Sequence, residues 1–67
     1  MYIVIGQNGI AKPVTLDQAI NHIVGEMYFP VSEQNKARLH FANGGSNFGV
    51  IYGFTRLDIQ RVEPCLV

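Results

Sequence analysis

The chain has one cysteine, no tryptophan and few charged side chains. Its single cysteine, Cys65, excludes an internal disulfide and fits a reducing compartment better than an oxidising one. Apolar runs are only a few residues long, so neither a membrane span nor a secretory signal is indicated, and we expect a cytoplasmic protein. His22, His40 and Cys65 lack the short paired spacings of zinc sites, so we expect no metal and no cofactor.

Charged residues make up 15% of the chain, and their formal sum is zero. A free-standing nucleic-acid-binding domain is usually basic, so this balance argues against that class. Hydrophobic residues make up 48% of the 67 residues. A domain this short buries only about 60% of the surface that its unfolded chain exposes. We therefore expect a single domain, residues 1–67, with apolar side chains left on its surface, where large patches mark interaction sites.

The N-terminal residues predict a β-hairpin. Residues 2–5 are β-branched or aromatic, as in a strand, and both faces are apolar, as in a strand that is covered on both sides. Asn8 and Gly9 favour the turn, because a type I′ turn needs positive φ at both central positions. Residues 10–14 are then the return strand, and Pro13 indicates that this strand lies at an edge of the sheet.

A helix is expected after this hairpin. Thr15 and Gln18 have the spacing of a capping box, in which each side chain bonds the other residue's backbone N–H. The apolar residues of this segment fall on one stripe at helical spacing: Leu16, Ala19, Ile20, Ile23, Val24 and Met27. His22 and Glu26, four residues apart on the polar side, are interpreted as a solvated pair. No nucleophile lies in the sequence context of a base, so no enzymatic activity is expected.

The second half of the chain predicts a second hairpin. Residues 36–42 alternate between polar and apolar, and residues 48–54 alternate again after the turn-forming residues 43–47. Residues 31–35 are expected to be a loop, and residues 57–62 fit either a further strand or a short helix. The expected fold is α+β: a small, mostly antiparallel ββαββ sheet with a possible fifth strand and one helix packed on one face.

The uncovered face of this sheet is the expected binding surface. In a strand, Lys36, Arg38 and His40 would share one face and form a modest basic patch. Arginine and aromatic residues are the usual anchors of interfaces. The predicted partner contacts are Arg38, His40, Tyr52 and Arg61.

The function expected from these features is that of a non-enzymatic protein-binding module. One alternative is a weak nucleic-acid-binding domain, whose binding would fall steeply with salt. Its contacts would be Lys36, Arg38, Arg56 and Arg61. The other alternative is a small structural homodimer, whose melting temperature would depend on concentration.

Two segments resemble a known family. Residues 15–19, Thr-Leu-Asp-Gln-Ala, and residues 61–66, Arg-Val-Glu-Pro-Cys-Leu, resemble the small bacteriophage inhibitor of host RNA polymerase. The resemblance implies a phage or mobile-element accessory protein that binds and inhibits a host bacterial protein assembly, either RNA polymerase or a defence complex. Residues 36–54 are an insertion relative to that family, and Glu63 stands where it has a basic residue.

Overall fold

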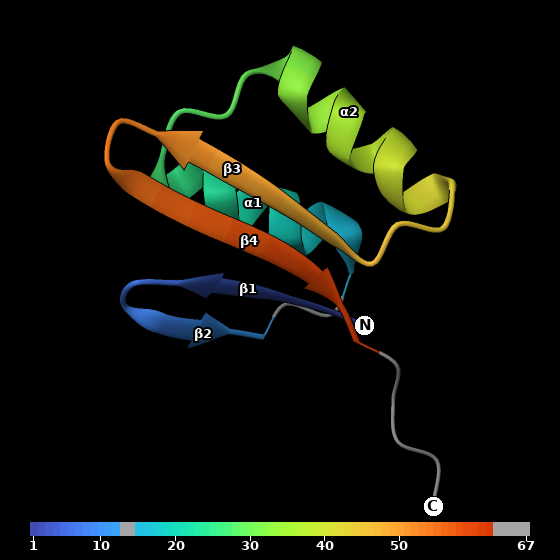
Figure 1. Cartoon of the computed structure of the whole chain (residues 1–67), viewed down its shortest axis with the longest axis horizontal. Coiled ribbons are helices and arrows are strands. Elements are labelled where there is room, and N and C mark those ends of the chain that lie inside the picture. The colour runs from blue at the N-terminus through green and yellow to red at the C-terminus, as the bar shows by residue number, and fades with distance from the viewer. Residues whose placement is uncertain (13–14, 63–67) are drawn as a thin grey trace, which may run out of the picture.

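The structure is a computed structural model, and it describes residues 1–12 and 15–62. Two strands, two helices and two further strands follow one another: β1 (Tyr2–Gly6), β2 (Gly9–Ala11), α1 (Leu16–Glu26), α2 (Val31–Ala42), β3 (Asn47–Tyr52) and β4 (Thr55–Arg61). The strands form one antiparallel sheet in the order β2-β1-β4-β3. In Figure 1, α1 lies behind the sheet and α2 lies above β3. The predicted α+β class with an antiparallel sheet is confirmed.

The predicted second hairpin is wrong in its location. Residues 31–42, expected as a loop and a strand, form the single helix α2, so the described chain has two helices where one was predicted. The hairpin partner of β3 is β4, so of the two alternatives for residues 57–62, strand and short helix, the strand is the one that forms. The order is therefore ββααββ, and the described residues contain four strands without a fifth.

Local sequence explains why α2 forms. Pro30 occupies its N-cap, Glu33 lies in its first turn, and the Gln34 side chain donates a hydrogen bond of 2.9 Å to the carbonyl of Phe29. At the other end, Gly44 has a φ of 92°, and the N–H groups of Gly44 and Gly45 bond back into the last turn. This is the Schellman arrangement that ends many helices. Strong helix formers fill the interior, and their propensity outweighs the two-residue alternation.

The first hairpin forms, with its turn one residue earlier than predicted. Gly6 pairs with Gly9, so the two turn residues are Gln7 and Asn8 rather than Asn8 and Gly9. Within this hairpin Gly9, directly after the turn, has a positive φ of 113°, a conformation that glycine adopts at little cost. The return strand β2 ends at Ala11, and the predicted continuation at residues 13–14 lies outside the described residues.

Both helices cover the same face of the sheet, and the core lies between them and the strands. Ten buried apolar residues make up this core: Val4, Ala19, Ile20, Ile23, Phe29, Ala37, Phe41, Val50, Leu57 and Ile59. Alternate residues of β1 and β4 point into it. Ile3 and Ile5 lie on the opposite face and are half-buried, so the expectation that β1 is covered on both sides is wrong for the described chain.

The predicted capping box at the start of α1 is confirmed. The backbone N–H of Gln18 donates to the Thr15 hydroxyl at 3.1 Å, and the Thr15 N–H donates to Oε1 of Gln18 at 3.1 Å. The helix ends at Glu26. Within residues 1–12 and 15–62, neither of the two helices is long and apolar enough to span a membrane.

Replacing Thr15 by alanine is expected to lower the free energy of unfolding by about 1 kcal/mol, because the first turn loses its side-chain acceptor. Urea unfolding followed by circular dichroism measures the change. Thr15→Ser is the matched control, since serine keeps a hydroxyl in the same position and should retain most of the stability. Equal losses in both variants would contradict a capping role for the hydroxyl.

Candidate protein-binding surface

The four predicted contact residues do not share one surface. Arg38 lies on α2 and pairs across to Asp17 on α1. Tyr52 lies at the last position of β3, and its ring contacts that of Tyr28, with centroids 5.5 Å apart. Arg61 lies at the end of β4, and its Nη2 donates to the carbonyl of Gly44 at 3.1 Å. Tyr52 is thus separated from Arg61 by nearly the whole length of the hairpin.

His40 and Arg61 come together at the turn between α2 and β3. The His40 carbonyl accepts from the N–H of Gly45, and a methyl group at Gly45 would overlap the His40 ring. The His40 ring also contacts Phe41 and Phe48, at centroid distances of 5.3 and 5.7 Å. Both predicted contact residues therefore take part in holding this turn against the sheet.

The expected basic patch on a strand face does not form, because residues 36–42 are helical. Lys36 donates to Glu33 on the same helix at 3.1 Å, and Arg38 is turned towards α1. Arg56 on β4 forms an ion pair with Asp58, also at 3.1 Å. Each of these cations therefore has a carboxylate beside it, which lowers the positive potential that a nucleic-acid backbone would meet.

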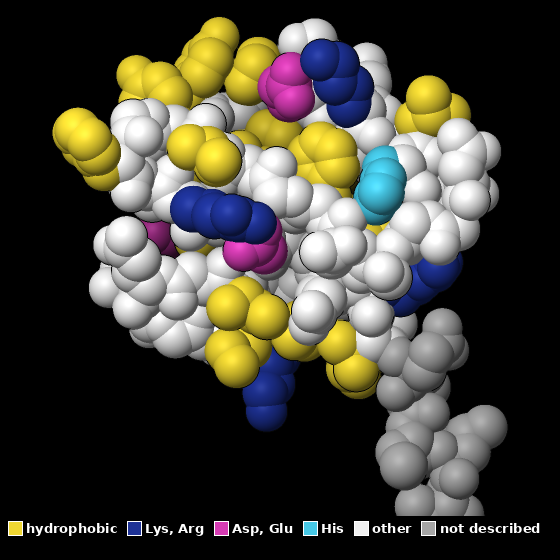
Figure 2. Space-filling view, in the orientation of Figure 1, with side chains coloured by type: hydrophobic (Ala, Val, Ile, Leu, Met, Phe, Trp, Pro, Cys, Tyr) yellow, Lys and Arg dark blue, Asp and Glu magenta, His cyan; other side chains and the backbone are white. Residues whose placement is uncertain are grey.

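A cluster of exposed hydrophobic residues gathers at the opposite end of the hairpin. We call it the apolar end: Tyr28, Val31, Ile51, Tyr52 and Phe54, each at least 58% exposed. They come from the α1–α2 connection, the start of α2, the end of β3 and the β3–β4 turn. Figure 2 shows hydrophobic side chains collected in this region. Of the five, only Tyr52 was among the predicted contacts.

Phe54 is the most exposed of these residues, at 101% of its reference area. It follows Gly53, which has a φ of 62°, and the pair Tyr52–Thr55 closes the turn. Glycine with positive φ at the first central position is typical of a type II′ turn, one of the tight turns that suit a hairpin. The Phe54 side chain therefore projects from a short, well-defined turn and was missed because residues 48–54 were expected to be one strand.

A groove runs beside the apolar end, between β3 and the α1–α2 connection. Its volume is about 300 Å³, and its lining residues are Tyr28, Phe29, Pro30, Glu33, Gly49, Val50 and Ile51. The lining is mainly apolar side chains and the backbone of β3. Its single charged residue, Glu33, is held by Lys36. Such a groove suits an uncharged, apolar side chain better than a polar ligand.

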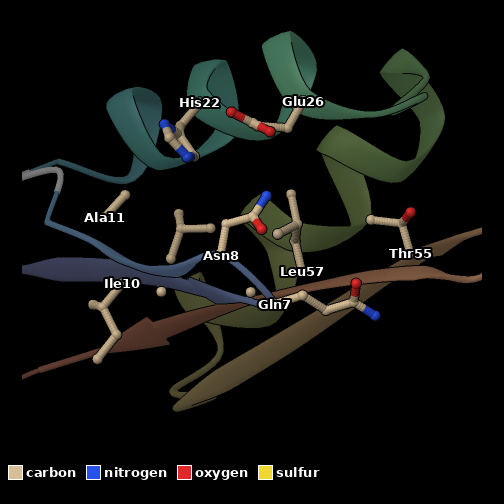
Figure 3. Close-up of a pocket in the computed structure, with 11 residues that line it drawn as sticks. Gln7, Asn8, Ile10, Ala11, His22, Glu26, Thr55 and Leu57 are labelled. Atoms are coloured by element: carbon tan, nitrogen blue, oxygen red, sulfur yellow. The ribbon is translucent and has the colours of Figure 1, made fainter.

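A second, more polar groove lies between α1 and the β1–β2 hairpin. It has a volume of about 450 Å³, and His22 and Glu26 project over it towards Asn8 and Leu57 (Figure 3). The helix face interpreted as solvated thus forms one wall of a groove. Within the described part of the chain, neither His22 nor Glu26 has a side-chain hydrogen-bond partner. The arrangement offers hydrogen-bonding groups to solvent, but no paired nucleophile and base.

Metal ligands do not gather in the described residues: no three His, Cys, Asp or Glu side chains lie together there. Cys65 lies outside the described residues. Comparison of the chain with protein-family models, curated proteins and solved structures gives no match.

Proposed function

We propose that the chain is a non-enzymatic protein-binding module that docks through its apolar end. The observation that carries this proposal is the contact between the Tyr28 and Tyr52 rings, both largely exposed, beside the fully exposed Phe54. Tyrosine and other large aromatic residues are common among the residues that dominate binding energy. Their rings offer a large contact area at a low cost in conformational entropy.

The size of the exposed surface supports the proposal. A whole aromatic side chain contributes roughly 150–250 Å², so three of them at these exposures leave on the order of 450 Å² in water. The largest apolar patch on a typical monomer is about 300–600 Å² and is often functional. Val31 and Ile51 add to the area, which brings the apolar end to the upper part of that range. A partner that covers it would remove this surface from water.

A bacterial target is the more specific part of the proposal. It rests on the resemblance of residues 15–19 and 61–66 to the phage inhibitor of host RNA polymerase. The chain would then act in the host cytoplasm by occupying a surface of RNA polymerase or of a defence complex. The apolar end lies away from Arg61, the family-like residue at the end of β4, so such a target would be engaged by a different surface.

Tyr52→Ala is expected to abolish or strongly reduce capture of a partner by the tagged protein from bacterial lysate treated with nuclease. The reason is that the ring that packs on Tyr28 is lost together with its contact area. Bound proteins are identified by mass spectrometry and quantified against the bait. Leu39→Ser is the matched control, because Leu39 is equally exposed but lies near the other end of α2.

The result would contradict the proposed surface if Tyr52→Ala and wild type capture the same partner in equal amounts. Loss of capture in Arg38→Ala but not in Tyr52→Ala would move the interface to the α1–α2 side. Material that disappears on nuclease treatment would instead support the nucleic-acid-binding alternative.

A further inference from the structure

We propose that the apolar end is self-complementary and that, when no host protein covers it, a second copy of this chain does so in a closed two-fold dimer. The inference rests on the proposed function, since it names a second occupant of the same surface. In this dimer, Phe54 of each copy enters the groove beside β3 of the other. The surface carries both parts of such an exchange: a projecting ring and, next to it, a groove.

The sizes of the two parts agree. A cavity of about 150 Å³ in a protein interior accommodates benzene, so a groove of this size has room for a phenylalanine side chain. The groove measures about 300 Å³ and is lined by Tyr28, Pro30 and Ile51 among others. Because Phe54 sits on a two-residue turn closed by the pair Tyr52–Thr55, its backbone is already ordered, and burial of the ring restricts only the side chain.

The charges also permit two copies to meet. In a two-fold contact the residues close to the axis meet their own counterparts, so an unpaired charge there would face a like charge. None of the five residues of the apolar end is charged. The groove's only carboxylate, Glu33, already has Lys36 as its partner at 3.1 Å. Charge repulsion therefore does not oppose this contact.

The area is that of a modest dimer. Two apolar ends at on the order of 450 Å² of aromatic surface each, with Val31 and Ile51 added, reach the low end of the roughly 1,200–2,000 Å² buried in stable interfaces. A two-fold contact of this kind uses the same surface on both copies and closes after two subunits. The dimer is therefore expected to dissociate on dilution.

Sedimentation equilibrium of the untagged full chain, from about 5 to about 500 µM, tests the proposal. The average mass is expected to rise with concentration from that of one chain towards that of two. Phe54→Ser should raise the dimer dissociation constant at least about tenfold, because a central aromatic anchor is removed. Leu39→Ser, equally a loss of an exposed apolar side chain on the same fold, should leave the constant unchanged.

A second variant tests the groove itself and leaves position 54 unchanged. Ile51→Lys places a cation at the rim of each groove while leaving Phe54 in place, and it should weaken the dimer by a similar factor. Circular dichroism spectra of all variants should match the wild type. A monomer at every concentration would overturn the dimer and leave the proposed function to the lysate experiment. A dimer that survives Phe54→Ser, or growth into longer oligomers, would also overturn it.

Discussion

Replacing Ile59 by alanine is expected to lower the free energy of unfolding by about 2–5 kcal/mol. Ile59 is 0% exposed and lies on β4, an inner strand of the sheet, where it pairs with Val4 on one side and Phe48 on the other. The truncation leaves a cavity that neighbouring elements on both sides can only partly fill. A domain of this length has a total stability of about 3–10 kcal/mol, so the variant is expected to be partly or wholly unfolded at room temperature.

Urea unfolding followed by circular dichroism measures this loss. Ile59→Val, which removes one methylene group, should cost about 0.5–1.5 kcal/mol. Ile10→Ala is the control for removing an isoleucine from a strand, because Ile10 is 59% exposed on the edge strand β2, and it should cost less than about 1 kcal/mol. Equal losses at Ile59 and Ile10 would mean that the assignment of the sheet's covered face is wrong.

Replacing Phe41 by alanine is expected to cost about 3–5 kcal/mol, because a buried aromatic side chain that ties α2 to the sheet is removed. Phe41 is 4% exposed, and its ring meets that of Tyr2 edge-on, with centroids 5.3 Å apart. The edge-to-face contact contributes roughly 0.5–1.5 kcal/mol beyond burial. Thermal unfolding monitored by the helical circular dichroism signal measures the change.

Leu39→Ala is the discriminating control for that experiment. In the helix α2, Leu39 points away from Phe41 and is 63% exposed, so its truncation should change stability by less than about 0.5 kcal/mol. In the strand predicted from the alternation of residues 36–42, Leu39 and Phe41 would share the buried face and both substitutions would be costly. A large loss for Leu39→Ala would therefore contradict the helix.

The α1 helix shows what the sequence was able to predict. Its capping box, its start at Leu16 and its buried stripe are local features, because each depends on residues within one or two turns. Of the six predicted stripe residues, Ala19, Ile20 and Ile23 are buried, and Leu16 and Met27 pack against the core. Val24, at the edge of the stripe, is exposed because no described element extends over it.

The α2 helix shows why the rest was not predicted. Its buried face has only two fully buried apolar residues, Ala37 and Phe41, so the helical period is weak beside an accidental alternation of polar and apolar residues. Local signals of a helix are present: Pro30 at its start, Glu33 in its first turn and Asn43-Gly44 at its end. The alternation of polar and apolar residues nevertheless favours a strand. A strand at residues 36–42 would be the neighbour of β3 in a hairpin, whereas in the structure that neighbour is β4, which includes residues 57–61.

The predicted binding surface depended on the same assignment of residues 36–42 to a strand. Lys36, Arg38 and His40 share a face only in a strand, whereas the apolar end forms only when the α1–α2 connection comes to lie beside the β3–β4 turn. Tyr28 and Tyr52 are far apart in the sequence, and no local pattern indicates their contact. The exposure of Phe54 could have been predicted from the sequence, because Gly53 before it favours a turn and residues in turns are exposed.

The pairing of β1 with β4 has a consequence for how the chain folds. The two inner strands of the sheet come from opposite ends of the described sequence, so Val4 finds its partner Ile59 only after nearly all residues between them are available. A chain emerging from the ribosome can form the first hairpin and α1, but their apolar faces stay in water until β4 arrives. Long-range pairing of this kind slows folding, since the intervening loop must close first. During synthesis the protein is therefore expected to pass from unfolded to folded late and in one step, with its apolar surfaces open to chaperones or to other nascent chains until then.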